Sequence, residues 1–357
     1  MSGTNQGMHV LITGGAGYIG THTCLVLLQR GYRCTVVDNL VSCSEDGLRR
    51  VREMVGCNNP DTAHYFKFYK VDLCDEGALE GVFSTAAKAG TPFDVCIHFA
   101  SLKSVAESVQ KPLLYYENNI KGTLNLLRLM DKHSCTNLIF SSSALVYGSA
   151  EVSLTEETPV GFGITNAYSR SKYMIEEILK DFKASKATSI SKQTEDRWNI
   201  IILRYFNPVG AHSSGCIGED PNGPPHNLMP YVAQVAVGRR PVLTVYGNDY
   251  NTPDGTGVRD FLHVMDLAEG HIAALEYMAS PSFPGFDTFN LGTGRGCSVL
   301  EMIEAMRRAT GHPIPYEFAP RRAGDIATCY AATEKAEKVP ALRAISVYFY
   351  GTFTSFR

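Results

Sequence analysis

A glycine-rich turn between a strand-like run and a helix-like run limits the fold of this chain more than any other feature. The turn, Gly14-Gly15-Ala16-Gly17-Tyr18-Ile19-Gly20, follows an apolar run at 9–13 and precedes a helical pattern at 21–30. Glycines at this spacing let backbone amides at a helix N-terminus approach a pyrophosphate. A glycine triplet alone is often only a tight turn. Its context favours a dinucleotide site, with cofactor contacts at Gly14, Gly17, Tyr18, Ile19 and Gly20.

Acidic residues follow the next two strand-like runs. Asp38 ends the run 35–38, where a carboxylate accepts hydrogen bonds from an adenosine ribose and repels a 2′-phosphate. NAD is therefore favoured over NADP, although Asp38 could instead cap the following helix. Asp72 comes after the third run and is expected to contact adenine. The alternative for Asp72 is an N-cap of the helix that begins near Asp75.

Short β-branched runs alternate with helical patterns through the first two hundred residues. Strands are expected at 9–13, 35–38, 66–71, 95–99, 138–142 and 200–203. Runs that are apolar throughout suit a parallel sheet covered on both faces, so the alternation predicts a doubly wound α/β (Rossmann) domain with strand order 3-2-1-4-5-6.

The texture changes to Gly, Pro and Asn from residue 207 onward, with helical patterns at 228–238 and 299–310. Residues 1–206 are therefore expected to form mainly the cofactor domain. Residues 207–337 are expected to form mainly a smaller C-terminal α/β substrate lobe. Residues 338–357 are apolar and β-like.

Composition excludes several partners. Lys and Arg total 33 against 36 Asp and Glu in 357 residues, so no basic field attracts nucleic acid or an anionic membrane. Ten cysteines without a Cys-x-x-Cys pair indicate neither a metal site nor a disulfide framework. The first residues lack the pattern of a signal peptide, and no apolar run reaches the ~20 residues of a membrane span. A cytoplasmic protein is expected.

Tyr168 and Lys172 lie four residues apart at the start of a helical pattern, a spacing that places phenol and ammonium on one helix face. A phenol titrates near ~10, so it acts as a base near neutrality only if a cation stabilises the phenolate. A solvated helix face is the common alternative for such a pair. Ser143 follows the serine-rich strand expected at 138–142. Ser143, Tyr168 and Lys172, together with the nucleotide site, predict hydride chemistry on an alcohol.

Further motifs occur along the chain in the same order. They are Val71-Asp72-Leu73, His98 to Lys103, Tyr115 to Asn119, Ser141 to Gly148, Leu203 to Pro208, Gly247 to Tyr250, Gly257 to Asp260 and Arg321 to Asp325. Together with the glycine turn and the Tyr168–Lys172 pair, they resemble the extended short-chain dehydrogenase/reductase family, and within it the members that epimerise nucleotide sugars. The resemblance covers residues 8–335.

The resemblance implies an isomerase that epimerises a UDP-hexose at C4, converting UDP-galactose to UDP-glucose. Tyr168 would remove the proton of the sugar 4-hydroxyl, Lys172 would lower the phenol pKa, and Ser143 would share the proton. NAD would take the hydride from C4 and return it to the other face of a transient 4-keto sugar. Because net redox change is zero, NAD is expected to stay tightly bound.

The resemblance also implies the other contacts. Those to NAD are Asn39, Asp72, Leu73, Phe99, Ala100, Lys103, Asn118 and Tyr205, together with Tyr168 and Lys172. Those to the nucleotide sugar are Lys103, Ser143, Ala144, Asn207, Asn227, Leu228, Tyr246, Arg259, Arg322, Asp325 and Cys329. The small side chain of Cys329 would leave room for an N-acetyl group, so the UDP-N-acetylhexosamines are expected as further substrates. A homodimer through helices at 113–130 and 168–182 is expected, although packing on the sheet explains their apolar stripes equally well.

Other activities stay open. Related dehydratases and decarboxylases typically carry an acidic residue just after the serine, where this chain has Ala144 and Leu145. A dehydrogenase that exchanges NAD with solvent is a second alternative. The third is a non-catalytic NAD-binding interaction protein, because residues 338–357 depart from the family pattern and could form an edge strand or a disordered extension.

Overall fold

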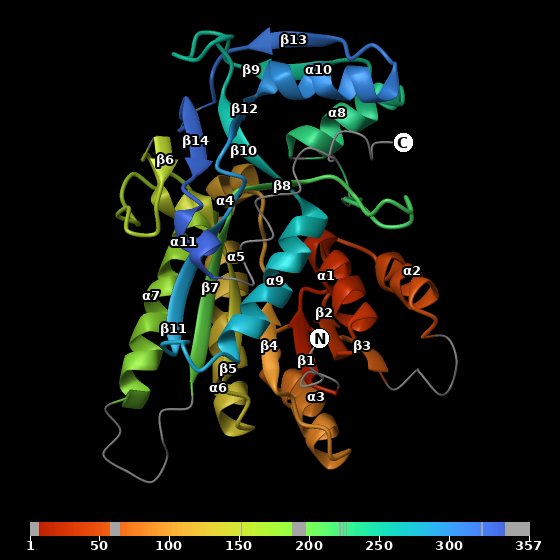
Figure 1. Cartoon of the computed structure of the whole chain (residues 1–357), viewed down its shortest axis with the longest axis vertical. Helices are drawn as coiled ribbons and strands as arrows, with labels where there is room; N and C mark the ends of the chain where they lie inside the picture. The colour runs from red at the N-terminus through yellow and green to blue at the C-terminus, as the bar shows by residue number, and fades with distance from the viewer. Residues whose placement is uncertain are drawn as a thin grey trace.

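A large parallel sheet with helices on both faces forms the main body of the protein, and a second lobe lies at one end of it (Figure 1). The computed structural model describes residues 7–57, 65–150, 152–187, 198–220, 223, 225, 227–322 and 324–339. The atypical tail expected from residue 338 lies outside the described residues from 340 onward.

All seven strands of the large sheet run parallel. In spatial order they are β11 (Phe286–Leu291), β7 (Asn199–Tyr205), β5 (Asn137–Ser143), β4 (Val95–His98), β1 (His9–Thr13), β2 (Arg33–Asp38) and β3 (Phe66–Lys70). The predicted order 3-2-1-4-5-6 is confirmed, with β7 as the sixth strand. β11 extends the sheet by a seventh strand, which pairs with β7.

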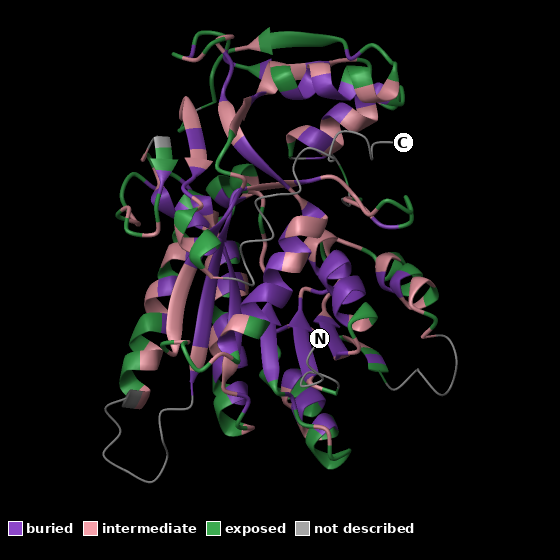
Figure 2. Cartoon of the chain, in the orientation of Figure 1, coloured by how far each residue is buried: buried purple, intermediate pink, exposed green. Residues whose placement is uncertain are grey.

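Alternate residues of each strand face opposite helical layers. Val10 and Ile12 pack with one layer, whereas Leu11 between them packs with the other. The first layer contains α1 (Tyr18–Gln29), α2 (Asp46–Met54) and α9 (Val264–Met278). The second contains α3 (Glu76–Lys88), α6 (Gly122–Lys132) and α7 (Ala167–Ala187). The sheet is consequently buried on both faces (Figure 2).

Three short elements precede α6. They are α4 (Val105–Gln110), α5 (Pro112–Tyr116) and a π-helical segment, η2 (Glu117–Lys121). The first was not predicted, and the other two, with α6, divide the helix expected at 113–130. α4 and α5 both contact α7. A π-helical turn is uncommon and is frequently found at functional sites.

The second lobe is built on two smaller sheets. Its strands are β6 (Val152–Leu154), β8 (Asn207–Val209), β9 (Leu243–Tyr246), β10 (Val258–His263), β12 (Gly296–Ser298), β13 (Tyr316–Ala319) and β14 (Thr328–Ala331). Its helices are α8 (Leu228–Ala236) and α10 (Val299–Thr310), and the short α11 (Glu334–Lys338) packs beside β11. The boundary at residue 206 is crossed in both directions. β6 precedes it but joins a sheet of the lobe, and β11 follows it but joins the large sheet.

Within the part of the chain that the structure describes, no helix is both long and apolar enough to cross a membrane.

Candidate active site

The glycine turn at the end of β1 is packed so tightly that two of its glycines admit no side chain. Gly14 has a φ of +68°, and a Cβ there would lie 2.5 Å from the backbone nitrogen of Ala100. A Cβ on Gly20 would lie 2.6 Å from the carbonyl oxygen of Gly14. Gly17, in contrast, is the N-cap of α1 and makes no side-chain cap. The first amides of α1 are therefore not capped by a side chain, which suits the pyrophosphate of a dinucleotide.

Asp38 lies beside this turn at the end of β2. Its carboxylate accepts hydrogen bonds from the backbone amides of Ala16 at 3.1 Å and Leu40 at 2.8 Å. Burial raises the pKa of Asp38, and these two amides oppose the shift. The alternative that Asp38 caps the next helix is wrong, because Glu45 occupies the N-cap position of α2.

Asp72 holds a neighbouring loop. Its carboxylate accepts from the side-chain amide of Asn39 at 3.0 Å and from the backbone amide of Cys74 at 2.8 Å. Asn39, expected to contact NAD, and Asp72, expected to contact its adenine, are thereby brought together. The N-cap of α3 is Asp75, whose side chain accepts from the amide of Ala78, so the alternative cap role of Asp72 is wrong.

The segment after β4 lies against the glycine turn. The amides of Phe99 and Ala100 both donate to the carbonyl oxygen of Thr13, at 2.9 and 3.1 Å. The next residues are held by Asn119 in η2, whose side chain bonds to the amide and carbonyl of Leu102 and to the hydroxyl of Ser171. The motif at 115–119 contains Asn119, but only its half-buried neighbour Asn118 was expected to contact NAD.

Lys103, at the end of this segment, meets the second lobe. Its amine contacts Glu219 at 3.2 Å, and the same carboxylate oxygen accepts from the side chain of Asn227 at 2.9 Å. Glu219 therefore brings together one residue expected to bind both ligands and one expected to bind the nucleotide sugar. No sequence motif had singled out Glu219.

Tyr168 and Lys172 lie in the first turns of α7, over the end of β5. The amine of Lys172 donates to the carbonyl oxygen of Ser141 at 2.7 Å, and only 2% of the residue is exposed. The alternative of a solvated helix face is therefore wrong for Lys172. The Ser143 hydroxyl lies near the phenol of Tyr168 and lowers its pKa. β5 and β1 flank β4 in the parallel sheet, so this group and the glycine turn share one sheet edge.

Burial governs the pKa values of both Tyr168 and Lys172. Burial raises the pKa of Tyr168 to about 12, and the Ser143 hydroxyl is what opposes the shift. Burial also lowers the pKa of Lys172 to about 7, so a smaller fraction of the amine is protonated at neutral pH than for an exposed lysine. The physical cause of both shifts is desolvation, which disfavours the charged forms of the phenol and the amine.

Tyr205, expected to contact the cofactor, is buried at the end of β7. Its hydroxyl hydrogen-bonds to the Nε2 atom of His271 on α9. The hydroxyl thus has a partner within the protein core, and only the ring remains for a ligand.

Arg259 and Cys329 are direct partners on the neighbouring strands β10 and β14. The guanidinium of Arg259 donates to the carbonyl oxygens of Val258 and Ile326, both at 2.9 Å. Cys329 is buried and packs with Ala144, which follows Ser143. Burial raises the pKa of the Cys329 thiol to about 11. The two strands therefore bring these expected substrate residues to the catalytic strand.

Arg322 and Asp325 form an exposed ion pair, with Nε of Arg322 2.8 Å from Asp325. The guanidinium also lies over the ring of Tyr246, 5.1 Å from its centroid. Asp325 lines a pocket of about 270 Å³ together with Leu145, Asn166 and Ser169, the last of which belongs to α7. Asp325 therefore lies between the lobe and the catalytic helix, and Arg322 joins it to Tyr246.

Asn207 and Leu228 complete the expected set. The side chain of Asn207 donates to the carbonyl oxygen of Asp260 at 3.0 Å, and Leu228 begins α8 directly after Asn227. Leu228 packs against the apolar core of the lobe. Both residues are held by the lobe itself.

Comparison with known proteins decides the family. The model of the NAD dependent epimerase/dehydratase family matches residues 10–292. The chain belongs to this family. The resemblance drawn from the motifs is confirmed.

Similar proteins cover nearly the whole chain. UDP-glucose 4-epimerase 1 of Oryza sativa subsp. japonica is 56% identical over 331 residues, which is 92% of this chain and 88% of that protein. UDP-glucose 4-epimerase of Homo sapiens is 50% identical over 336 residues, 92% of this chain and 90% of that protein. The crystal structure of UDP-glucose 4-epimerase from Bifidobacterium longum in complex with NAD+ and UDP has a TM-score of 0.84 at 47% identity and covers 98% of both chains.

Proposed function

We propose that this protein is a NAD-dependent UDP-hexose 4-epimerase that interconverts UDP-galactose and UDP-glucose. The contact of Tyr168 with Ser143, above a buried Lys172 and at the same sheet edge as the glycine turn, carries the proposal. The positions after Ser143 are Ala144 and Leu145, so they supply no carboxylate for dehydration or decarboxylation. The named relatives support the same activity.

The residues present fit NAD. The N-terminus of α1, which no side chain caps, would hold the pyrophosphate. Asp38 would hold the ribose, and the pair Asn39–Asp72 would hold the adenine end. NAD, when bound, accepts a hydride from an alcohol carbon and returns it. Glu219 would orient Lys103 beside the bound ligands.

Tyr168 in its ionised, phenolate form takes the proton of the sugar 4-hydroxyl, and the Ser143 hydroxyl shares it. Lys172 keeps the serine-rich strand end and the catalytic helix in register through the carbonyl of Ser141. On the return step the same phenol gives the proton back to the 4-keto oxygen, so protons and electrons balance over the cycle. Arg259, Arg322 and the amides of Asn207 and Asn227 hold the UDP moiety.

The test is incubation of the full chain with UDP-galactose and identification of the product. The parent should form UDP-glucose, and Tyr168→Phe should reduce kcat by about 10²- to 10⁴-fold while keeping NAD bound. A Tyr168→Phe variant as active as the parent would refute the assignment.

A homodimer is part of the proposal. Apolar side chains on the outer side of α4, α5 and α7 face solvent: Val109 is 62% exposed, Leu113 75% and Met174 38%. The sheet does not cover these three, so packing on the sheet does not explain them, and contact with a second copy would. A cytoplasmic location also belongs to the proposal, supported by ten free thiols.

A further inference from the structure

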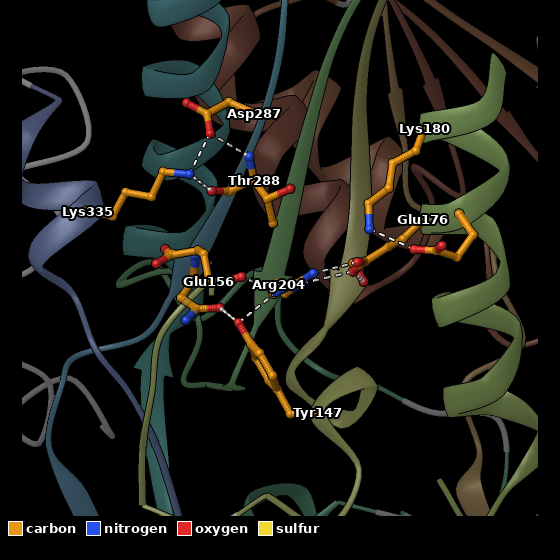
Figure 3. Close-up of polar contacts among 11 residues, drawn as sticks. Tyr147, Glu156, Glu176, Lys180, Arg204, Asp287, Thr288 and Lys335 are labelled. Carbon is orange, nitrogen blue, oxygen red and sulfur yellow. Dashed lines mark hydrogen bonds and ion pairs between the residues drawn. The ribbon is translucent and has the colours of Figure 1, made fainter. Parts of the chain in front are cut away.

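A buried ion pair lies directly behind the proposed catalytic groups. Glu176 follows Lys172 by one helical turn on α7, and Arg204 lies on β7 as the register partner of Ser142. The guanidinium donates two hydrogen bonds to the carboxylate, from Nε to Oε1 at 3.1 Å and from Nη2 to Oε2 at 2.7 Å. The side chain of Arg204 is 4% exposed and that of Glu176 is 0% exposed. Figure 3 shows the two side chains facing each other.

The pair touches the elements that carry all three proposed catalytic residues. Glu176 also accepts from the hydroxyl of Ser142 at 2.5 Å, next to Ser143. Nη1 of Arg204 donates to the hydroxyl of Tyr147 at 2.9 Å, at the end of the 3₁₀ turn η3 (Ala144–Tyr147) that follows Ser143. The ion pair therefore joins α7, β5 and η3.

The network continues toward the second lobe. The hydroxyl of Tyr147 donates to Oδ1 of Asn290 on β11 at 2.7 Å. The side-chain amide of Asn290 donates to the carbonyl oxygen of Leu154 on β6 at 2.7 Å. β6 pairs with β14, the strand that carries Cys329. The chain of hydrogen bonds thus runs from the catalytic helix to the sheet of the substrate lobe.

We propose that Glu176 and Arg204 are positioning residues for epimerisation, which fix the Ser143–Tyr168–Lys172 group against the substrate lobe. This inference rests on the proposed function. A buried ion pair is weak evidence for stability, because apolar residues of similar volume often stabilise a fold as well or better. Small misplacement of catalytic groups, in contrast, lowers turnover strongly. Because the pair contacts every element that carries a catalytic residue, its main contribution is to fix the relative positions of these residues.

Glu176 also acts on the charge of Lys172. Its carboxylate opposes the lowering of the Lys172 pKa that burial causes. The other titratable groups on the elements packed around this amine are Tyr168 on α7, His98 on β4 and Tyr205 on β7. Burial lowers the pKa of His98 to about 3 and raises the pKa of the two phenols, so none of the three changes charge near neutral pH.

The test uses the full chain with NAD and a double variant, Glu176→Met with Arg204→Met, which avoids an unpaired buried charge. We expect it to fold and to retain NAD, with kcat lowered at least about tenfold and KM changed less than about threefold. The matched control is Glu177→Gln, on the next residue of α7, whose carboxylate pairs with Lys180 on the exposed face at 2.7 Å. It should leave kcat and KM unchanged. A folded double variant with the kcat of the parent would overturn the proposal.

A second measurement does not depend on turnover. NMR of lysine-labelled protein, with Lys172 assigned from a Lys172→Met spectrum, follows the titration of its amine. The midpoint should move to lower pH in the double variant and stay in place in Glu177→Gln. An unchanged midpoint in the double variant overturns the effect of Glu176 on Lys172. If the parent fails to convert UDP-galactose, the proposed function fails. The titration midpoint of Lys172 still tests the effect of Glu176 on this amine.

Discussion

The amine of Lys172 donates a 2.7 Å hydrogen bond to the carbonyl oxygen of Ser141, two residues before Ser143. This bond ties the start of α7 to the end of β5. The same amine lies 4.9 Å from the ring centroid of Phe140. A cation expected to act on a phenol and to contact NAD is therefore also part of the joint between helix and sheet.

Replacing Lys172 by Met should change how stability depends on pH. Burial lowers the pKa of Lys172 from 10.5 to about 7. Between these values the unfolded chain holds a proton that the folded chain has lost, so the free energy of unfolding of the parent should rise with pH relative to Lys172→Met, by up to about 1.4 kcal/mol per pH unit. Denaturant unfolding at pH 7 and pH 9 measures this. Lys180→Met, at an exposed position of the same helix, is the control, and parallel curves for parent and Lys172→Met would contradict the prediction.

Two glycines of the cofactor turn should respond differently to the same substitution. Gly14→Ala forces a Cβ to 2.5 Å from the Ala100 nitrogen at a φ of +68°, so we expect a loss of at least about 2 kcal/mol in unfolding free energy. Gly17→Ala meets its first neighbour at 3.4 Å and should unfold within about 1 kcal/mol of the parent. Its retention of NAD should fall, because the methyl group would lie at the proposed pyrophosphate site. Cofactor content after gel filtration decides this, and full retention by Gly17→Ala would argue against that site.

Residue 329 should set the tolerance for an N-acetyl group. Cys329 is small and buried beside Ala144, so a tyrosine there would take up space at the proposed sugar site. We expect the parent to convert UDP-N-acetylgalactosamine, and Cys329→Tyr to lower that kcat/KM at least about tenfold while UDP-galactose changes far less. Cys329→Ser controls for the thiol. Equal losses for both substrates would point to a packing defect instead.

The proposed dimer surface can be broken with charge. Val109→Glu together with Leu113→Glu should convert a dimer to monomers, because both side chains lie exposed on α4 and α5. Sedimentation velocity gives the oligomeric state. Val237→Glu, equally exposed after α8, should leave the dimer intact. A parent that sediments as a monomer would refute the dimer.

Predictions from local pattern were accurate where the signal is local. The apolar run at 9–13, its glycine turn and Asp38 predicted one βαβ unit, and β1, α1 and β2 appear there. The strand at 286–291 was not predicted, since nothing near it in the chain indicates that it pairs with β7. Pairing over such a distance depends on the whole sheet.

The candidate site divides in the same way. Motifs placed Tyr168, Lys172 and Ser143 together. Glu219 lies in no motif, and the motifs that contain Asn119 and Arg204 did not indicate their partners, which lie far along the chain. Glu176 did have a signal, because it follows Lys172 at the spacing of one helix turn.

Residue order was sufficient to establish the doubly wound fold, the nucleotide site and the family, because glycine spacing, strand periodicity and helix spacing are local properties of the chain. The protonation of Tyr168 and Lys172, the partners of Asp72 and Tyr205, and the Glu176–Arg204 joint depend on folding. Desolvation and long-range hydrogen bonds arise only once β5, β7 and α7 pack together, so only the tertiary structure could decide them.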